Sequence, residues 1–414
     1  MLYTKKFNNY INSILPGLFI VGYVIGTGSV TSMIVAGARY GMSFTWALFL
    51  SCAFTFILLV TISRLTIVTK NTIMFNIKKH IGWFASIFVI AGLMVTVISS
   101  IIGVMAVVAQ VVQEWSRPLT ANNAGISPII ISIIFLSFLL FLYWTGKHGI
   151  FIRFVSLMVG VMGLAFILTN FMIIVDPAEV FKGLVPNIPS QGQPHLIIAG
   201  IVGTTMAAVV LVSRSSVIAE KGWSKDELHI ERRDSMISAT VLFLVSAAIM
   251  ASAAGTLHIR GIMVENAIDM VSTLEPLAGR FAMAVFVTGI IAAGLSSIFP
   301  NMLLLPWLIC DYRGMNRDLT KTIFRILVVI VTISGLIIPV FGGRPVIIMI
   351  ASQAFSPLMM PLLIIFLLII MNRKKVMGIY TNGFWLNTGL IITLLFSIFM
   401  FFIAFEGYVD FFSG

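Results

Sequence analysis

The chain has 414 residues, of which 59% are hydrophobic and only 10% charged, and its formal net charge is +11. Soluble domains carry about a quarter of charged residues, so the composition excludes a soluble globular protein and indicates an all-α polytopic membrane protein. Apolar segments long enough to cross a bilayer recur along the whole chain. They predict eleven transmembrane helices, at about residues 12–40, 43–66, 83–113, 127–145, 151–175, 194–220, 235–256, 282–310, 322–341, 345–371 and 384–406.

The positive charge is unevenly distributed along the chain. Lysines and arginines gather in alternate loops, for example at Lys78, Lys79, Lys374 and Lys375. The positive-inside rule makes these loops cytoplasmic, so we expect a multi-pass protein of the cell (inner) membrane with its N-terminus in the cytoplasm and its C-terminus outside. The basic charge is then a signal of topology. We expect the lipid bilayer as a partner and no nucleic acid, and the sequence leaves the oligomeric state open.

The first predicted span contains the stretch GTGS at residues 26–29, in the middle of an apolar segment. A glycine in a helix interior costs about 1 kcal/mol relative to alanine. Non-helical backbone at membrane depth is tolerated where it lies against protein or lines a water-filled cavity. The stretch therefore predicts a broken helix, although small residues that let two helices pack closely are an alternative explanation.

The sixth predicted span has a second interruption, at Gly203, Thr204 and Thr205. Interrupted helices at corresponding positions of two halves are typical of transporters built from inverted repeats, and they mark the substrate site. The two breaks predict a first five-span repeat over residues 1–175 and an inverted second repeat over 176–371. An eleventh span with a short outer C-terminus would follow over 372–414.

Several segments resemble the Nramp (natural resistance-associated macrophage protein) family of divalent-metal transporters. They are PGLFIVGYVIGTGSVTSMIVAGARYGMSFTW around the first break, GLVPNIP and GIVGTTMAAVVLVSRSSVI around the second, AAGLSSIFPNMLL in span 8 and MIASQAFSPLMMPLLIIFLLIIMNRKKVMG in span 10. The resemblance covers nearly the whole chain without large gaps. It implies a LeuT-like fold of eleven helices with helices 1 and 6 broken, and secondary transport of a metal ion.

The sequence departs from the family where the metal should bind. The family's Asp-Pro-Gly-Asn motif corresponds to Gly26, Thr27, Gly28 and Ser29 in this chain, so the Asp and Asn ligands are replaced. The family's Ala-Thr-Val-Met-Pro-His motif corresponds to residues 204–209, which replaces its methionine and histidine with Ala207 and Val209; a second family histidine is Arg214. The span 3 carboxylates of the family, which carry protons, are replaced by Ser99 and Ser100.

The residues left at these positions form a candidate substrate site without charged side chains. We expect it to consist of Gly26, Thr27, Gly28, Ser29, Thr204, Thr205, Ala207 and Gln353. A divalent cation normally needs about six oxygen ligands with at least one carboxylate, and helix ends supply only about half a charge each. Such a site suits a zwitterion, a neutral polar solute or a largely hydrated cation, and the sequence leaves any metal ligands unknown.

Polar residues next to this site are candidates for the pathway, namely Ser99, Ser100, Ser213, Arg214 and Asn301. Two interpretations of Arg214 stay open: a charge in the inner pathway that disfavours cations, or a side chain that reaches the cytoplasmic headgroups. All carboxylates are expected at span ends or in loops, so proton coupling in the family's usual manner is not expected.

Three functions remain in competition at this point. The first is a secondary transporter of a metal ion of the Mg²⁺ or Mn²⁺ type, by resemblance. The second is a transporter of a small organic or amino-acid-like solute on the same fold, and the third is a non-transporting sensor or receptor. The conservation of both helix breaks argues against the third. We expect no enzymatic activity and no cofactor.

Overall fold

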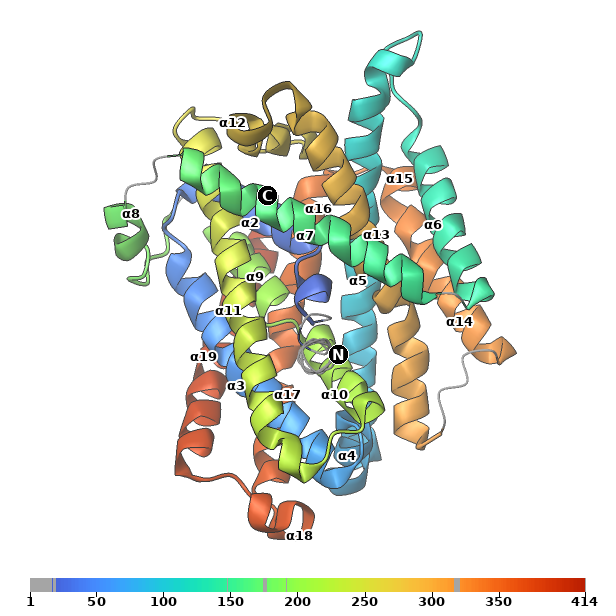
Figure 1. Cartoon of the computed structure of the whole chain (residues 1–414), viewed down its shortest axis with the longest axis vertical. Helices are drawn as coiled ribbons and strands as arrows, with labels where there is room; N and C mark the ends of the chain where they lie inside the picture. The colour runs from blue at the N-terminus through green and yellow to red at the C-terminus, as the bar shows by residue number, and fades with distance from the viewer. Residues whose placement is uncertain are drawn as a thin grey trace, which may run out of the picture.

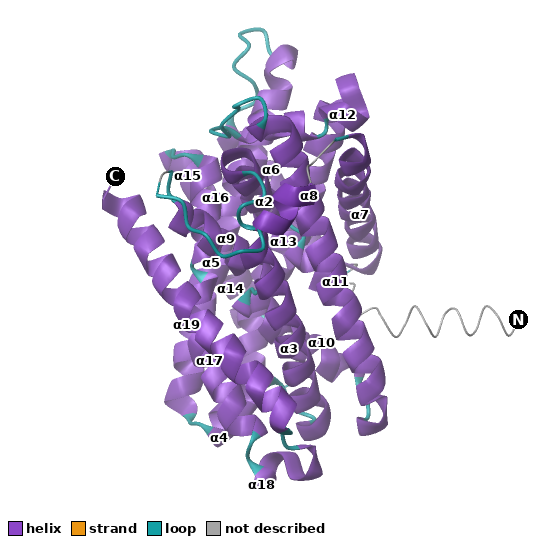
Figure 2. Cartoon of the chain, turned by 90° about the vertical axis from the view of Figure 1, so that its left-hand side faces the viewer, coloured by secondary structure: helices purple, strands orange, loops and turns teal. Residues whose placement is uncertain are grey.

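The computed structural model describes residues 17, 20–146, 148–173, 177–190, 192–315 and 321–413. Every regular element of these residues is a helix, and Figure 2 shows that most helices follow the long axis of the molecule while most loops lie at its two ends. Nine helices in the described part are long and apolar enough to cross a membrane. The first predicted span lies partly outside the described residues. In the fifth, the described apolar helix, Gly160–Met172, is shorter than the nine. The number of eleven spans therefore remains a prediction.

The main helices follow the predicted segments closely. They are α2 (Thr27–Tyr40), α3 (Thr45–Thr69), α4 (Ile73–His80), α5 (Trp83–Ser116), α6 (Pro128–Thr145), α7 (His148–Met172), α8 (Pro177–Lys182), α9 (Pro194–Thr205), α10 (Ala208–Lys221), α11 (Leu228–Ala253), α12 (Glu275–Ala278), α13 (Ala282–Arg313), α14 (Thr322–Ile333), α15 (Ile337–Phe341), α16 (Pro345–Ala354), α17 (Ser356–Met371), α18 (Lys374–Met377) and α19 (Phe384–Ser413). In Figure 1, α12 and α15 lie at one end of the molecule, which we call the upper end, and α4 and α18 lie at the lower end.

Proline and glycine set many of the helix boundaries. Pro128, Pro194 and Pro345 are each the first residue of a helix, where the missing N–H costs nothing because it would have no partner within the helix. Gly146 and Gly222 follow the last residues of α6 and α10 with φ of 66° and 70°. This left-handed conformation is one that glycine adopts without strain, and it ends a helix.

The broken pair α9 and α10 forms the centre of the bundle. Its most apolar stretch is buried completely inside the protein, whereas the corresponding stretches of α6 and α14 are mostly exposed. Helices α2, α3, α16, α17 and α19 pack around the pair. An apolar helix that is buried on all sides is a core element, so polar groups on α9 and α10 face other helices and not lipid.

One helix begins earlier than the sequence predicted. The seventh span was expected at 235–256, but α11 starts at Leu228, and a π-helical turn at Ala254–His258 follows it. The extra turns bring Glu231 and Asp234 onto a helix that packs against α2 and α3. Both carboxylates are 1% exposed, although the sequence had suggested loop or span-end positions.

Candidate functional site

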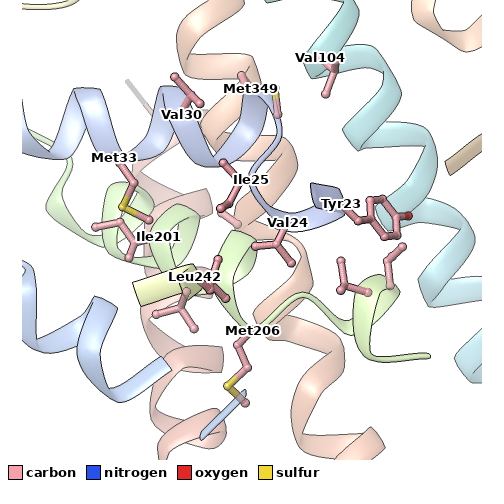
Figure 3. Close-up of a cluster of buried hydrophobic side chains, with 14 of the residues drawn as sticks. Tyr23, Val24, Ile25, Val30, Met33, Val104, Ile201, Met206, Leu242 and Met349 are labelled. Carbon is pink, nitrogen blue, oxygen red and sulfur yellow. The ribbon is translucent and has the colours of Figure 1, made fainter. Parts of the chain in front are cut away.

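Both predicted helix breaks are present. The helical turn that includes Tyr23 and Val24 ends there, Gly26 is extended with φ −103° and ψ −173°, and α2 begins at Thr27. The sixth span is helical to Thr205, is irregular at Met206 and Ala207, and resumes as α10 at Ala208. Figure 3 shows Tyr23, Val24 and Ile25 at the first break and Met206 at the second, close to one another in the core.

A cavity of about 50 Å³ lies between the two breaks. Its polar lining residues are Tyr23, Ser29, Thr96, Ser100, Thr204, Ser297, Asn301, Gln353 and Ser356. These side chains offer hydroxyl and amide groups, and none of the described lining residues is a carboxylate, histidine, lysine or arginine. A cavity of this size holds a few water molecules or a small ion, and it is well below the volume of typical pockets for organic ligands.

A chain of hydrogen bonds runs along one wall of the cavity. The Tyr23 hydroxyl donates to Oδ1 of Asn301. The amide nitrogens of Asn301 and Gln353 both donate to the Ser100 hydroxyl, at 3.3 and 3.5 Å. This chain connects the first span with α13, α5 and α16, and the side-chain oxygen Oε1 of Gln353 accepts no hydrogen bond from a described residue. That oxygen is therefore available to a ligand.

Another wall is formed by the first break and the start of α2, where Gly26, Gly28 and Ser29 line the cavity. The Ser29 hydroxyl is buried and forms no hydrogen bond with a described residue. The hydroxyls of Thr27, Thr31 and Ser32 are also buried without a partner among the described residues, but they do not line the cavity. The first N–H groups of a helix also lack intrahelical partners. Buried polar groups without partners cost about 1–3 kcal/mol each, so the start of α2 is prepared for a polar ligand or water.

The second break contributes in a different way. The Ala208 N–H, the first of α10, donates to the Ser356 hydroxyl at 2.9 Å, which caps this helix from α17. Val209 and Val210, the next residues of α10, line the cavity. The N-terminal, positive ends of α2 and α10 thus both start at the cavity wall.

The two glycines of the first break are required by close packing as well as by the break. A Cβ atom on Gly26 would lie 1.9 Å from the Ser297 hydroxyl oxygen, and one on Gly28 would lie 2.6 Å from the Met349 methyl carbon. A Cβ on Gly203 would lie 2.0 Å from the backbone oxygen of Gln353. Helices α13 and α16 therefore close directly on the breaks, which confirms the close packing, while the substrate site at the breaks remains a prediction.

The cavity contains part of the predicted site. Gly26, Gly28, Ser29, Thr204, Ala207 and Gln353 line it, together with Ser100 and Asn301 from the predicted pathway. Four other predicted residues are buried or bonded elsewhere. Thr27 does not line the cavity, the Thr205 hydroxyl bonds to Ser51 at 2.6 Å, and the hydroxyls of Ser99 and Ser213 bond to the backbone of their own helices.

Four polar lining residues were not predicted from the sequence: Tyr23, Thr96, Ser297 and Ser356. Helical spacing contains a signal for Ser297, which lies four residues before Asn301 and so shares a face of α13 with a predicted residue. Tyr23 lies on the helical turn just before the first break. Thr96 and Ser356 depend on how helices α5 and α17 pack against the breaks.

Arg214 lies neither in the cavity nor at the membrane surface. It is completely buried, and its Nη2 lies 2.6 Å from Oδ2 of Asp234 and 3.7 Å from Oε1 of Glu231. Its Nε donates to the Ser63 hydroxyl at 2.9 Å. Both interpretations of Arg214 proposed from the sequence are corrected by this geometry, because the charge is neutralised inside the protein.

Asp234 also contacts the first span. The Gly17 N–H donates to Oδ1 of Asp234 at 2.9 Å. Arg214 lies seven residues after Ala207, which is about 10 Å along a helix. We call Arg214, Glu231 and Asp234 the charged cluster; it joins α10, α11 and the first span on the lower side of the cavity.

Comparison with known proteins places the chain in a family. Residues 17–405 match the family model described as "Natural resistance-associated macrophage protein-like". The chain is 26% identical over 386 residues to a divalent metal cation transporter MntH of Klebsiella pneumoniae, which covers 91% of this chain and 89% of that protein. A relative with the same description from Clostridium acetobutylicum is 28% identical over 234 residues, and this match spans only about half of each protein (54% and 53%).

Solved structures show the same fold. The manganese transporter of Eremococcus coleocola aligns with a TM-score of 0.74 at 15% identity, covering 97% of this chain and 88% of the other. A nucleobase-cation-symport-1 family transporter with bromovinylhydantoin bound aligns with a TM-score of 0.55 at 17% identity, covering 94% and 92%. The fold is therefore the LeuT-like fold of membrane transporters, and the chain belongs to the Nramp family.

Proposed function

We propose that this protein is a secondary transporter, and not an enzyme, that moves a divalent cation of the Mg²⁺ or Mn²⁺ type across the cell membrane by alternating access. The printed descriptions of its relatives name divalent metal cations as their substrates. The observation that supports transport in this chain is the small polar cavity enclosed between two helix breaks in the core. In this fold such breaks hold the substrate at the membrane midplane.

The lining groups limit the kind of cation. All candidate ligands are oxygen atoms of hydroxyls, amides and backbone, because Ala207 stands where the family has a methionine. Oxygen ligands favour hard cations, whereas thioethers favour softer transition metals. Mg²⁺ gives up its water shell reluctantly and usually keeps several waters in proteins, which fits a cavity without formal charge. We therefore propose a cation that is bound weakly and with most of its water.

A second candidate substrate is a small organic or amino-acid-like solute. The absence of formal negative charge among the described lining residues favours it, since a cation in the membrane interior normally has a carboxylate partner. The opposed helix ends would suit a zwitterion, and the unpaired N–H groups at the start of α2 would donate hydrogen bonds to its carboxylate.

We further propose the orientation and the repeat boundaries expected from the sequence. The lower end carries Lys78, Lys79, Lys374 and Lys375, which makes it cytoplasmic by the positive-inside rule. Helix α19 would then end outside the cell. The division into repeats at residues 1–175 and 176–371 agrees with the position of one helix break in each half.

Uptake into proteoliposomes that contain a Mg²⁺-sensitive or a Mn²⁺-sensitive dye tests the proposal. We expect dye responses to external Mg²⁺ that saturate, and a marked reduction in the Gln353→Ala variant, because it loses the free carbonyl oxygen. Gln113→Ala is the matched control, since that glutamine lies near the upper end and bonds to Ala124. An absence of any cation response in vesicles that take up an organic solute would reject the cation and favour the second candidate.

A further inference from the structure

A second cavity, of about 250 Å³, opens at the upper end of the molecule. We call it the upper cavity. It is lined by the ends of α2, α9 and α16 and by the loop before Asn266: Arg39, Gln193, Leu196, Ile197, Val264, Glu265, Arg344, Val346, Ile347 and Ile350. It is five times as large as the central cavity, and the two share no lining residue.

The upper cavity lies directly above the central one along two helices. Ile350 lines the upper cavity and Gln353, one turn later in α16, lines the central cavity. Ile350 also packs closely against Gly200 of α9. A Cβ atom on Gly200 would lie 2.8 Å from the Cγ2 methyl carbon of Ile350. The close contact of Ile350 with Gly200 thus lies between the residues that line the two cavities on α9 and α16.

The charges in the upper cavity are mainly positive. Arg39 and Arg344 face one carboxylate, Glu265, and no ion pair joins any of these three to another described residue. Arg39 donates to the backbone oxygen of Gly192 at 3.4 Å, while its Nε is buried without a hydrogen-bond partner. Arg344 is exposed, and its side chain makes no hydrogen bond with a described residue. Both guanidinium groups therefore retain free donors.

Two helix starts add to the positive potential. Helices α9 and α16 begin at Pro194 and Pro345, and neither has a side-chain cap. The residues of their first turns, including Leu196 and Val346, line the cavity. The uncapped N–H groups and the helix dipoles at these ends favour negative charge.

The floor of the cavity is apolar. It consists of branched aliphatic side chains, namely Leu196, Ile197, Val264, Val346, Ile347 and Ile350. A ligand that fits must combine an anionic group with an apolar body. A bare divalent cation does not fit, because two unpaired guanidinium groups repel it.

We infer that the upper cavity is a binding site for a small organic carboxylate, which places its carboxylate between Arg39 and Arg344 and its aliphatic body on the apolar floor. The planar guanidinium group forms paired hydrogen bonds with carboxylates. Glu265 disfavours a second negative charge, so the site selects monocarboxylates. This inference does not depend on the proposed cation transport, and its test measures binding and not uptake.

Thermal-shift and calorimetric titrations of the detergent-purified full chain test this inference. The probes are 4-methylpentanoate, isoamylamine, which has a similar aliphatic body and the opposite charge, and MgCl₂. We expect saturable stabilisation by the carboxylate only. Arg344→Gln is expected to weaken this binding by about tenfold, as for the loss of one charge-assisted hydrogen bond.

Variants separate the site from general effects of charge. Arg117→Gln is the matched control, because Arg117 also lies at the upper end but is paired with Glu114 outside the cavity; it should bind the carboxylate as the wild type does. Glu265→Gln should tighten carboxylate binding several-fold by removing the nearby negative charge.

Two results would overturn the inference. One is equal stabilisation by the carboxylate and the amine. The other is carboxylate binding that stays unchanged in both Arg344→Gln and Arg39→Gln. Folding of Arg344→Gln is not in question, because the side chain is exposed and bonds to no described residue, and Mg²⁺ uptake by this variant reports separately on the transport function.

Discussion

The central cavity and the charged cluster lie about 10 Å apart along α10, and they differ in the polar groups that they contain. The cavity contains polar groups without formal charge, and one of them, the Ser29 hydroxyl, has no hydrogen-bond partner among the described residues. The charged cluster contains one buried cation, Arg214, which is paired with two buried carboxylates and donates to the Ser63 hydroxyl. Polar groups without partners are free to bind a ligand, whereas compensated charges hold helices together.

This contrast assigns separate roles to the two regions. Asp234 contacts both Arg214 of α10 and the N–H of Gly17 in the first span. It thus joins the two broken helices on the lower side of the cavity. Opening the pathway on this side would require these contacts to separate, so we expect the charged cluster to act as a closed gate and the cavity to act as the binding site.

The largest effect is expected from breaking the charged cluster. Asp234→Ala leaves Arg214 buried without its nearest partner, which should destabilise the protein by about 3–5 kcal/mol. Thermal unfolding in detergent measures the effect. Asp226→Ala, at an exposed position near the same end, is the control and should change little. Equal melting of the two variants would show that the cluster does not hold the helices.

A second variant distinguishes charge compensation from simple packing. Replacing a buried ion pair with apolar residues of similar size is often neutral or stabilising. The triple variant Arg214→Met, Glu231→Gln and Asp234→Leu removes all three charges and should therefore regain much of the stability that Asp234→Ala loses. If Asp234 acts as part of a gate, the triple variant should still show altered transport in proteoliposomes, because Gly17 has lost its acceptor.

The next largest effect is expected at the close contact beside the cavity. Gly203→Ala places a Cβ 2.0 Å from the backbone oxygen of Gln353, which must push α9 away from α16 and cost about 1–3 kcal/mol. Gly160→Ala is the matched control, because a Cβ there meets nothing within 4 Å and alanine favours the helix. A stable, active Gly203→Ala protein would contradict the close packing at this site.

Restoring the family's metal ligands tests the neutral character of the cavity. The substitutions Gly26→Asp, Ser29→Asn and Ala207→Met are combined with Ser297→Ala, and only this combination should raise Mn²⁺ affinity. We expect an increase of about tenfold or more, measured by calorimetry. Without that change the new aspartate clashes with the Ser297 hydroxyl. Ser296→Ala is the control, because this hydroxyl bonds within its own helix. Tight Mn²⁺ binding by the wild type would refute the neutral site.

The smallest effect is expected from the hydrogen-bond chain in the cavity wall. Ser100→Ala removes the acceptor shared by Asn301 and Gln353, at 3.3 and 3.5 Å, and should cost about 0.5–1.5 kcal/mol. We expect a few-fold rise in the KM of uptake with a small change in melting temperature. Ser99→Ala is the adjacent control, since its hydroxyl bonds mainly to Thr96. The same KM rise in both variants would argue against a specific role of Ser100.

The amino-acid sequence by itself determined the broad architecture. Long apolar segments determine helices in a membrane, since every backbone polar group must be satisfied within the segment. Local signals, such as Gly26 in an apolar run and proline at 128, 194 and 345, determine where helices break and begin. These preferences act over a few residues along the chain, which is why both breaks were predicted within a few positions of where they lie.

Only the tertiary structure decided which polar groups meet. Tyr23, Thr96, Ser297 and Ser356 reach the cavity because four helices close around the breaks, and Thr205 turns away from it to bond to Ser51. The two carboxylate partners of Arg214 come from α11, which begins earlier than the hydropathy pattern indicates. Contacts between helices depend on rotation and depth of packing, and these are set by the fit of many side chains at once and not by local sequence.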